Sequence, residues 1–160
     1  MAMLRASLVS TAALLLLTPL YGARAAENPG YIEDLSRSTT GIGKFYMGRE
    51  ISFVMGHQAA EWLNRPSRIE EEMPDSVVEN MNLNEDDVVA DIGAGSGYFS
   101  FRIARKVPNG KVLAVDIQPE MLQLIEDTKA SDGVDNIEGI LGQIDDPNLP
   151  VDSIDAAIMV

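Results

Sequence analysis

The pattern of apolar and polar positions changes its period at Val88. From there on, short β-branched runs alternate with longer stretches of helical periodicity, and turn residues such as Pro108-Asn109-Gly110 separate them. Strands that alternate with helices predict an α/β fold with a doubly wound, mostly parallel sheet. The predicted strands and helices are, in chain order, 88–92 (strand), 97–107 (helix), 111–117 (strand), 119–130 (helix), 136–142 (strand) and 153–160 (strand).

The last predicted strand, residues 153–160, is followed by no helix. Parallel sheets normally bury both faces under crossover helices. We therefore expect the α/β domain to be incomplete at its C-terminus and to expose an apolar strand edge there.

The stretch before the α/β pattern has a different character. Residues 46–63 carry apolar side chains at helical spacing, which predicts a helix. Residues 26–43 are polar and punctuated by glycine, which is typical of a loosely ordered lead-in. We therefore predict an N-terminal lead-in and helical segment over 26–74, followed by the α/β domain over 75–160.

Residues 1–25 have the features of a signal peptide. A short basic start precedes an apolar stretch, Pro19 interrupts it, and Ala23-Arg24-Ala25 supplies small residues where cleavage would occur. This pattern predicts export to the periplasm or the cell exterior. An uncleaved signal that anchors the chain in the membrane is the alternative; without it, we expect no stable membrane association.

Composition narrows the function classes. The 160-residue chain has no cysteine, which excludes disulfide scaffolds, thiolate metal sites and cysteine nucleophiles. Its formal charge is −13 and its basic residues never cluster, so we expect no nucleic-acid partner.

The candidate chemistry lies in "DIGAGSGYFS", directly after the first predicted strand. Gly93, Gly95 and Gly97 allow a tight turn and let backbone N–H groups approach a ligand closely. A dinucleotide site would carry a glycine where Tyr98 stands. An acid ahead of the glycines, Asp91, would also repel a pyrophosphate, whereas it suits a ligand with an ammonium group.

A second acid, Asp116, ends the next predicted strand, 19 residues beyond Gly97. A carboxylate at that position can accept the hydroxyl groups of a ribose. Ile117 follows it and can pack on a base. Together these residues indicate a nucleoside ligand with a cationic amino-acid tail.

The stretches "VVADIGAGSGYFSFRIA" and "VLAVDIQPEML" resemble the S-adenosylmethionine (SAM) site of class I, Rossmann-like methyltransferases. The resemblance covers about residues 75–160 and indicates a bacterial member of unassigned substrate. It implies a SAM-dependent methyltransferase that acts on an unidentified acceptor, expected to be a small molecule. It also implies cofactor-binding roles for Asp91, Gly93, Ala94, Gly95, Gly97, Asp116 and Ile117.

The adenine contact stays open between two residues. The family usually has an acid after a glycine beyond the third strand, and here Gln143 occupies that position. The loop is about two residues longer than usual, so Asp145 is the second candidate. The residues that select and deprotonate the acceptor usually follow the fourth strand, and we assign no catalytic residue.

Two other functions stay open: an NAD(P)-dependent oxidoreductase, and a non-catalytic SAM- or nucleoside-binding module. A further stretch, residues 41–68, resembles leader segments of bacterial class I-like methyltransferases and is expected beside or over the SAM cleft. Within it, His57, Glu61 and Glu50 would share one face of the predicted helix. We favour a solvated helix face over a metal site or a general base there, and we expect Trp62 in the core.

Overall fold

The computed structural model describes residues 30–34 and 38–160. The predicted signal peptide therefore lies outside the described residues. The described chain forms two compact units, one ending at Phe53 and one comprising Val54–Val160. Among the described helices, none combines the length and the apolar character that a membrane crossing requires.

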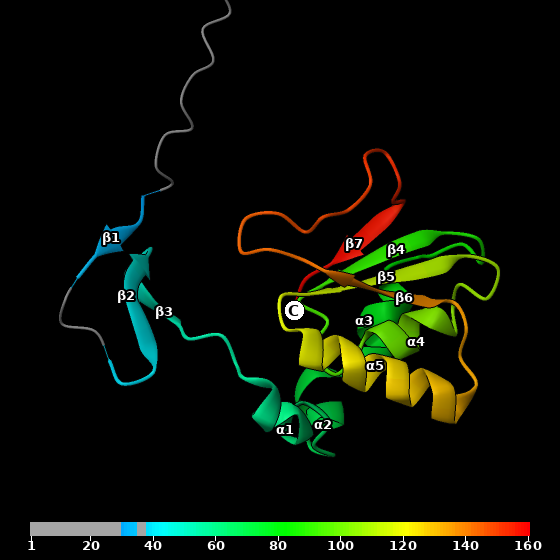
Figure 1. The fold of residues 1–160 in the computed structure, drawn as a ribbon, viewed down its shortest axis with the longest axis horizontal. Coiled ribbons are helices and arrows are strands. Elements are labelled where there is room, and N and C mark those ends of the chain that lie inside the picture. Colours follow the sequence, from blue (N-terminus) through cyan, green and yellow to red (C-terminus); the bar gives the residue numbers. More distant parts are fainter. Residues whose placement is uncertain (1–29, 35–37) are drawn as a thin grey trace, which may run out of the picture. The chain divides into compact units, whose positions relative to one another are not determined.

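The first unit is a three-stranded antiparallel sheet (Figure 1). Its strands are β1 (Ile32–Glu33), β2 (Gly41–Tyr46) and β3 (Arg49–Ser52), in the order β1-β2-β3. The predictions of a loose lead-in over 26–43 and of a helix starting at Tyr46 are therefore wrong for the described residues of this unit.

A tight hairpin replaces the start of the predicted helix. Tyr46 pairs with Arg49, so only Met47 and Gly48 form the turn, with φ of 48° and 79°. Positive φ at both central residues is the conformation that matches the twist of two paired strands. The Glu50 carboxylate also accepts the backbone N–H groups of Ser38 and Gly43, each at 3.0 Å, and so ties the hairpin together.

Helical structure begins only after residue 56. A short 3-10 helix, His57–Ala59, leads into α1 (Ala60–Leu63), which is followed by α2 (Arg68–Glu72) and α3 (Pro74–Asn80). Pro74 stands at the first position of α3, where its missing N–H costs no hydrogen bond. The expected N-terminal helical segment is thus real, but it is shorter and more broken than its apolar spacing predicts.

The α/β prediction is confirmed. Four parallel strands lie in the order β6-β5-β4-β7, so that β4 and β5 are flanked on both sides. Helix α4 (Ser100–Ala104) connects β4 to β5, and α5 (Pro119–Asp132) connects β5 to β6. The strands are β4 (Val88–Ile92), β5 (Lys111–Asp116), β6 (Ile137–Leu141) and β7 (Ala156–Ile158).

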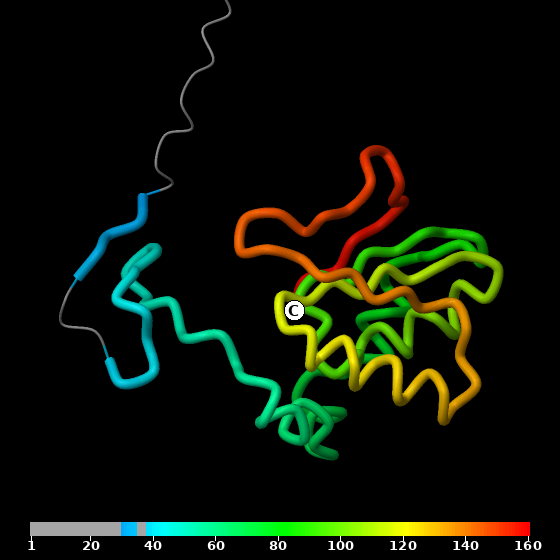
Figure 2. The backbone as a smooth tube through the Cα atoms, in the orientation of Figure 1, coloured from blue at the N-terminus to red at the C-terminus, as the bar shows by residue number. Residues whose placement is uncertain are grey.

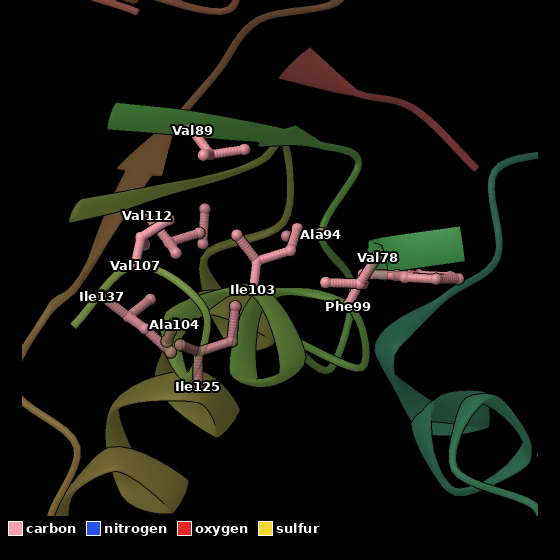
Figure 3. Close-up of a cluster of buried hydrophobic side chains, with 11 residues drawn as sticks. Val78, Val89, Ala94, Phe99, Ile103, Ala104, Val107, Val112, Ile125 and Ile137 are labelled. Atoms are coloured by element: carbon pink, nitrogen blue, oxygen red, sulfur yellow. The ribbon is translucent and has the colours of Figure 1, made fainter. Parts of the chain in front are cut away.

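Helices α3, α4 and α5 lie on one face of this sheet, and the chain after β6 loops back before it enters β7 (Figures 1 and 2). Buried side chains from strands and helices meet between the layers (Figure 3). Val89, Val112 and Ile137 come from three neighbouring strands, and Ile103 and Ile125 come from α4 and α5. This core holds the carboxyl ends of β4 and β5 side by side, which is where doubly wound folds bind ligands.

Candidate cofactor-binding site

A cavity of about 650 Å³ opens at the carboxyl ends of β4 and β5. Its size is in the range of small-molecule and cofactor sites. Ile92 and Val115, the last or next-to-last residues of these strands, line it, and so do four residues at or just after the strand ends, which we call the floor: Gly93, Gly95, Asp116 and Ile117. The rest of the lining comes from residues 54–63, from the start of α5, from the loop after β6 and from the residues after β7.

Backbone hydrogen bonds hold the glycine loop of the floor. The N–H groups of Gly93 and Ala94 both donate to the Val115 carbonyl, each at 2.9 Å. Gly93 has a φ of 79°, and a side chain there would point into open space. The loop is therefore attached to the neighbouring strand, while the side of Gly93 that faces the cavity is left free for a ligand.

The other two glycines face protein. A Cβ on Gly95 would lie 2.9 Å from Leu63 Cδ1, and one on Gly97 would lie 2.8 Å from Phe101 Cε2. Gly97 does not line the cavity. Ala94 is buried and does not line it either. These two predicted site residues shape the turn and its packing; their direct contact with a ligand stays a prediction.

Asp116 combines a fixed position with unused acceptor capacity. Its Oδ2 accepts the Gly95 N–H and its Oδ1 accepts the Gln118 N–H, each at 2.9 Å. A carboxylate has about four lone-pair sites, so about two stay available at the cavity wall. That is the acceptor arrangement which a pair of ribose hydroxyls needs.

Asp91 has a different environment from Asp116. It is only 3% exposed, does not line the cavity, and its Oδ2 accepts the Ser100 hydroxyl at 2.6 Å. Burial raises the pKa of the Asp91 carboxyl, and hydrogen bonds from Ser100 and the nearby Arg68 charge only partly oppose that shift. Asp91 thus joins β4 to the start of α4; its predicted contact with the amino group of a ligand stays a prediction.

The predicted base-binding residues lie together on the cavity wall. Ile117, Gln143 and Asp145 all line it, and Met121 and Ile144 add apolar surface beside them. Gln143 and Asp145 are both exposed, so each is accessible to a ligand. The choice between them for the adenine contact stays open.

Sequence reasoning missed the residues that lie across the cavity from the floor. Val54, Met55 and Leu63 line it, and we call residues 54–64 the cover segment. Their stretch was expected near the cleft only from its resemblance to leader segments, and here it borders the cavity. Gln118, which also lines the cavity, was missed because no motif marks it.

The predicted shared helical face of His57, Glu61 and Glu50 does not form. Glu50 lies on β3, whereas Glu61 lies in α1. The nearest acid to His57 is Glu120, with 3.9 Å between Nδ1 and Oε2. Within residues 30–34 and 38–160, no group of three or more His, Asp or Glu residues is arranged to hold a metal ion.

The expectation of a buried Trp62 is wrong as well. The side chain is 53% exposed, and the Arg65 guanidinium stacks on its ring at 3.7 Å from the centroid.

The fold and the site define a doubly wound α/β domain with a nucleoside-type cavity at its strand ends. Residues 89–160 match the family model described as "Methyltransferase domain". These residues form a methyltransferase domain of the class I, SAM-dependent type. This finding confirms the resemblance and favours SAM over the NAD(P) alternative.

Individual similarities agree with this family. A solved SAM-dependent methyltransferase from Aquifex aeolicus superposes with a TM-score of 0.62 at 28% identity, over 66% of this chain and 57% of that one. The chain is 28% identical over 134 residues to the 2-methyl-6-phytyl-1,4-hydroquinone methyltransferase 1 of Oryza sativa, covering 83% of this chain and 36% of the relative. It is 40% identical over 68 residues to a probable ribosomal RNA small subunit methyltransferase A of Methanosarcina barkeri, and this alignment covers 42% of this chain and 22% of the relative. The chain spans 16 to 36% of the length of the curated relatives it matches.

Proposed function

We propose that this protein binds SAM in the cavity at the ends of β4 and β5 and transfers its methyl group to a small, largely apolar acceptor. The observation that carries the proposal is the pair of free acceptor sites on Asp116, held beside the open glycine turn at Gly93. The methyltransferase family of residues 89–160 supports the same reading.

The residues present fit SAM in shape and in charge. Asp116 would accept the ribose hydroxyls, while Ile117 and Met121 would pack on the adenine. In the described part of the chain, the cavity is lined by Asp116, Asp145 and Asp146 and by no lysine, arginine or histidine. A wall whose only charged side chains are acidic favours a ligand with positive charge.

For methyl transfer, the main task of the protein would be to position SAM and the acceptor. SAM supplies a methyl group that its sulfonium already activates. The floor would hold the donor in one orientation, so that an acceptor entering the cavity meets the methyl in line; such pre-orientation lowers the entropic part of the barrier.

The lining also suggests the class of acceptor. Apart from its carboxylates and the amides of Gln118 and Gln143, the cavity is walled mostly by apolar side chains, such as Val54, Met55 and Met159. Phosphate groups would meet negative charge there, so a nucleic-acid acceptor fits poorly. The hydroquinone methyltransferase relative, which aligns over most of this chain, supports a small-molecule acceptor.

Binding and turnover test this proposal separately. Calorimetric titration should show one site for S-adenosylhomocysteine (SAH), the demethylated product, and none for NADH. Incubation with SAM and a panel of hydroquinones should then release SAH, whereas the same assay with ribosomal RNA should not. Binding of NADH but not SAH would restore the oxidoreductase alternative, and SAH binding without turnover on any acceptor would favour a non-catalytic module.

Export is a separate part of the proposal. The basic start, the apolar stretch and Ala23-Arg24-Ala25 support a signal peptide that is cleaved before Ala26. N-terminal sequencing of the protein from the producing cell should find Ala26 first. An intact N-terminus on membrane-bound protein would favour the anchor, and one on protein from the cytoplasm would overturn export.

A further inference from the structure

The side chain of Gln118, the residue after Ile117 of the floor, holds the first part of the cover segment. The Gln118 Oε1 accepts the His57 N–H at 3.0 Å, and the Gln118 Nε2 donates to the Met55 carbonyl at 2.7 Å. One amide group thus satisfies a backbone donor and a backbone acceptor in a segment about 60 residues away in sequence. Such paired bonds define position and direction together, as a strand pairing does.

The position of Gln118 connects these bonds to the ligand site. Its own backbone N–H donates to Asp116 Oδ1, the carboxylate that would accept the ribose. Its side chain lines the cavity, and so does the side chain of Met55, whose carbonyl it holds. The residue therefore contacts the floor through its main chain and the cover segment through its side chain.

Few other contacts hold the cover segment over the glycine loop. The Ser96 hydroxyl donates to Asn64 Oδ1 at 3.0 Å, and the Leu63 side chain lies against Gly95. The His57 ring lies 3.9 Å from the Glu120 carboxylate, an exposed pair worth little by itself. These contacts hold the far end of the segment, whereas Gln118 holds residues 55–57.

From this arrangement we infer that Gln118 is a positioning residue, which holds residues 54–57 as the wall of the cavity opposite the floor and so retains the bound nucleoside and excludes water. The inference rests on the proposed function for the identity of the ligand. It assigns no bond-making step to Gln118, because the amide is already satisfied by the backbone of the cover segment.

The test is the Gln118→Ala variant with SAH as the probe and Gln123→Ala as the matched control. Gln123 lies on the same helix and bonds only to Asp127 at the exposed surface. The Gln118→Ala change keeps the backbone N–H that donates to Asp116. Loss of the two side-chain bonds should accelerate SAH dissociation about tenfold, with a smaller change in the association rate.

A second readout needs no ligand. The backbone amide of His57 donates to Gln118 Oε1. In ligand-free Gln118→Ala, hydrogen–deuterium exchange at the His57 amide should be faster than in the wild type or in Gln123→Ala. Gln118→Met, which keeps the side-chain length but cannot form either bond, should behave like Gln118→Ala, and it replaces that variant if the alanine variant does not fold.

The outcomes separate this inference from the proposed function. If the wild type does not bind SAH, the proposed function fails, and the exchange experiment still decides whether Gln118 holds residues 55–57. If the wild type binds SAH and both Gln118 variants release it at the wild-type rate, the inference is overturned while the proposed function stands. Unchanged exchange at the His57 amide in both variants would overturn it as well.

Discussion

The floor of the cavity and its cover segment are built in opposite ways. The floor follows two central, buried strands, and its loop is bonded to the neighbouring strand through backbone groups. The cover segment contains short helical turns and is attached by a few side-chain bonds, those of Gln118, Ser96 and Arg68, whose guanidinium donates to the Leu63 carbonyl at 2.8 Å. The sheet fixes the floor regardless of ligand, whereas the cover can be loosened without disturbing the core. Ligand affinity should thus depend on both regions and folding mainly on the first.

The largest effect is expected at Gly97, in the glycine loop that carries part of the floor. The φ of 80° disfavours any side chain, and a Cβ would press on Phe101 and Ile125. Gly97→Ala should lower the free energy of unfolding by about 2–5 kcal/mol, as backbone strain and overpacking add. Gly93→Ala, with nearly the same φ but open space, should lose only about 1–2 kcal/mol. Denaturant unfolding measures both, and equal losses would show that packing at Gly97 is unimportant.

The next effect concerns the ligand. Asp116→Asn removes the charge that would bind the ribose but keeps one oxygen to accept a backbone N–H. SAH affinity should fall about ten- to hundredfold, the scale of hydrogen bonds to a charged group. Asp127→Asn, an exposed change on α5, serves as the control. Unchanged affinity in Asp116→Asn would place the ligand elsewhere.

A third prediction concerns the pH dependence of stability and the buried carboxyl group of Asp91. Because burial raises the folded-state pKa of Asp91, the folded protein holds its proton at pH values where the unfolded chain has lost it. Stability should therefore fall as the pH rises from the ordinary aspartate pKa of about 3.9 through the raised folded value. Asp91→Asn should lose less stability over the same range in a series of thermal melts. If the melting temperatures of the wild type and of Asp91→Asn change with pH by the same amount, ionisation of Asp91 in the folded protein costs no stability.

The smallest effect is expected where the cover segment meets the loop. Ser96→Ala removes the bond to Asn64 and should lower the free energy of unfolding by about 0.5–1.5 kcal/mol. Ser131→Ala, whose hydroxyl bonds only locally at the exposed end of α5, is the control. A loss as large as that of Gly97→Ala would mean that the cover is part of the core, contrary to the comparison above.

The floor could be predicted from sequence because its determinants are local. A short β-branched run, a glycine turn and an acid at the next strand end specify β4, β5 and the residues between them. The structure adds the order in which the strands pair, β6-β5-β4-β7.

The first part of the helix predicted over 46–63 was mispredicted, because the apolar positions before residue 57 fit two periods. Ile51, Val54 and Met55 have helical spacing, but the Met47-Gly48 turn and strand pairing dominate the first part of the stretch. The glycine in that turn was the available signal for a hairpin. The role of Gln118 could not be predicted, because its partners are backbone groups that only the fold brings near.

The most direct test of the account is hydrogen–deuterium exchange of the full chain with and without SAH. If the ligand lies between floor and cover, SAH should slow exchange in three segments: residues 93–97 and 116–121, which include the floor, and residues 54–64, the cover segment. Residues 123–132, on the rest of α5, should change little. Protection of the floor without the cover segment would contradict the two-sided site, and no protection of the floor would contradict a SAM site in this cavity.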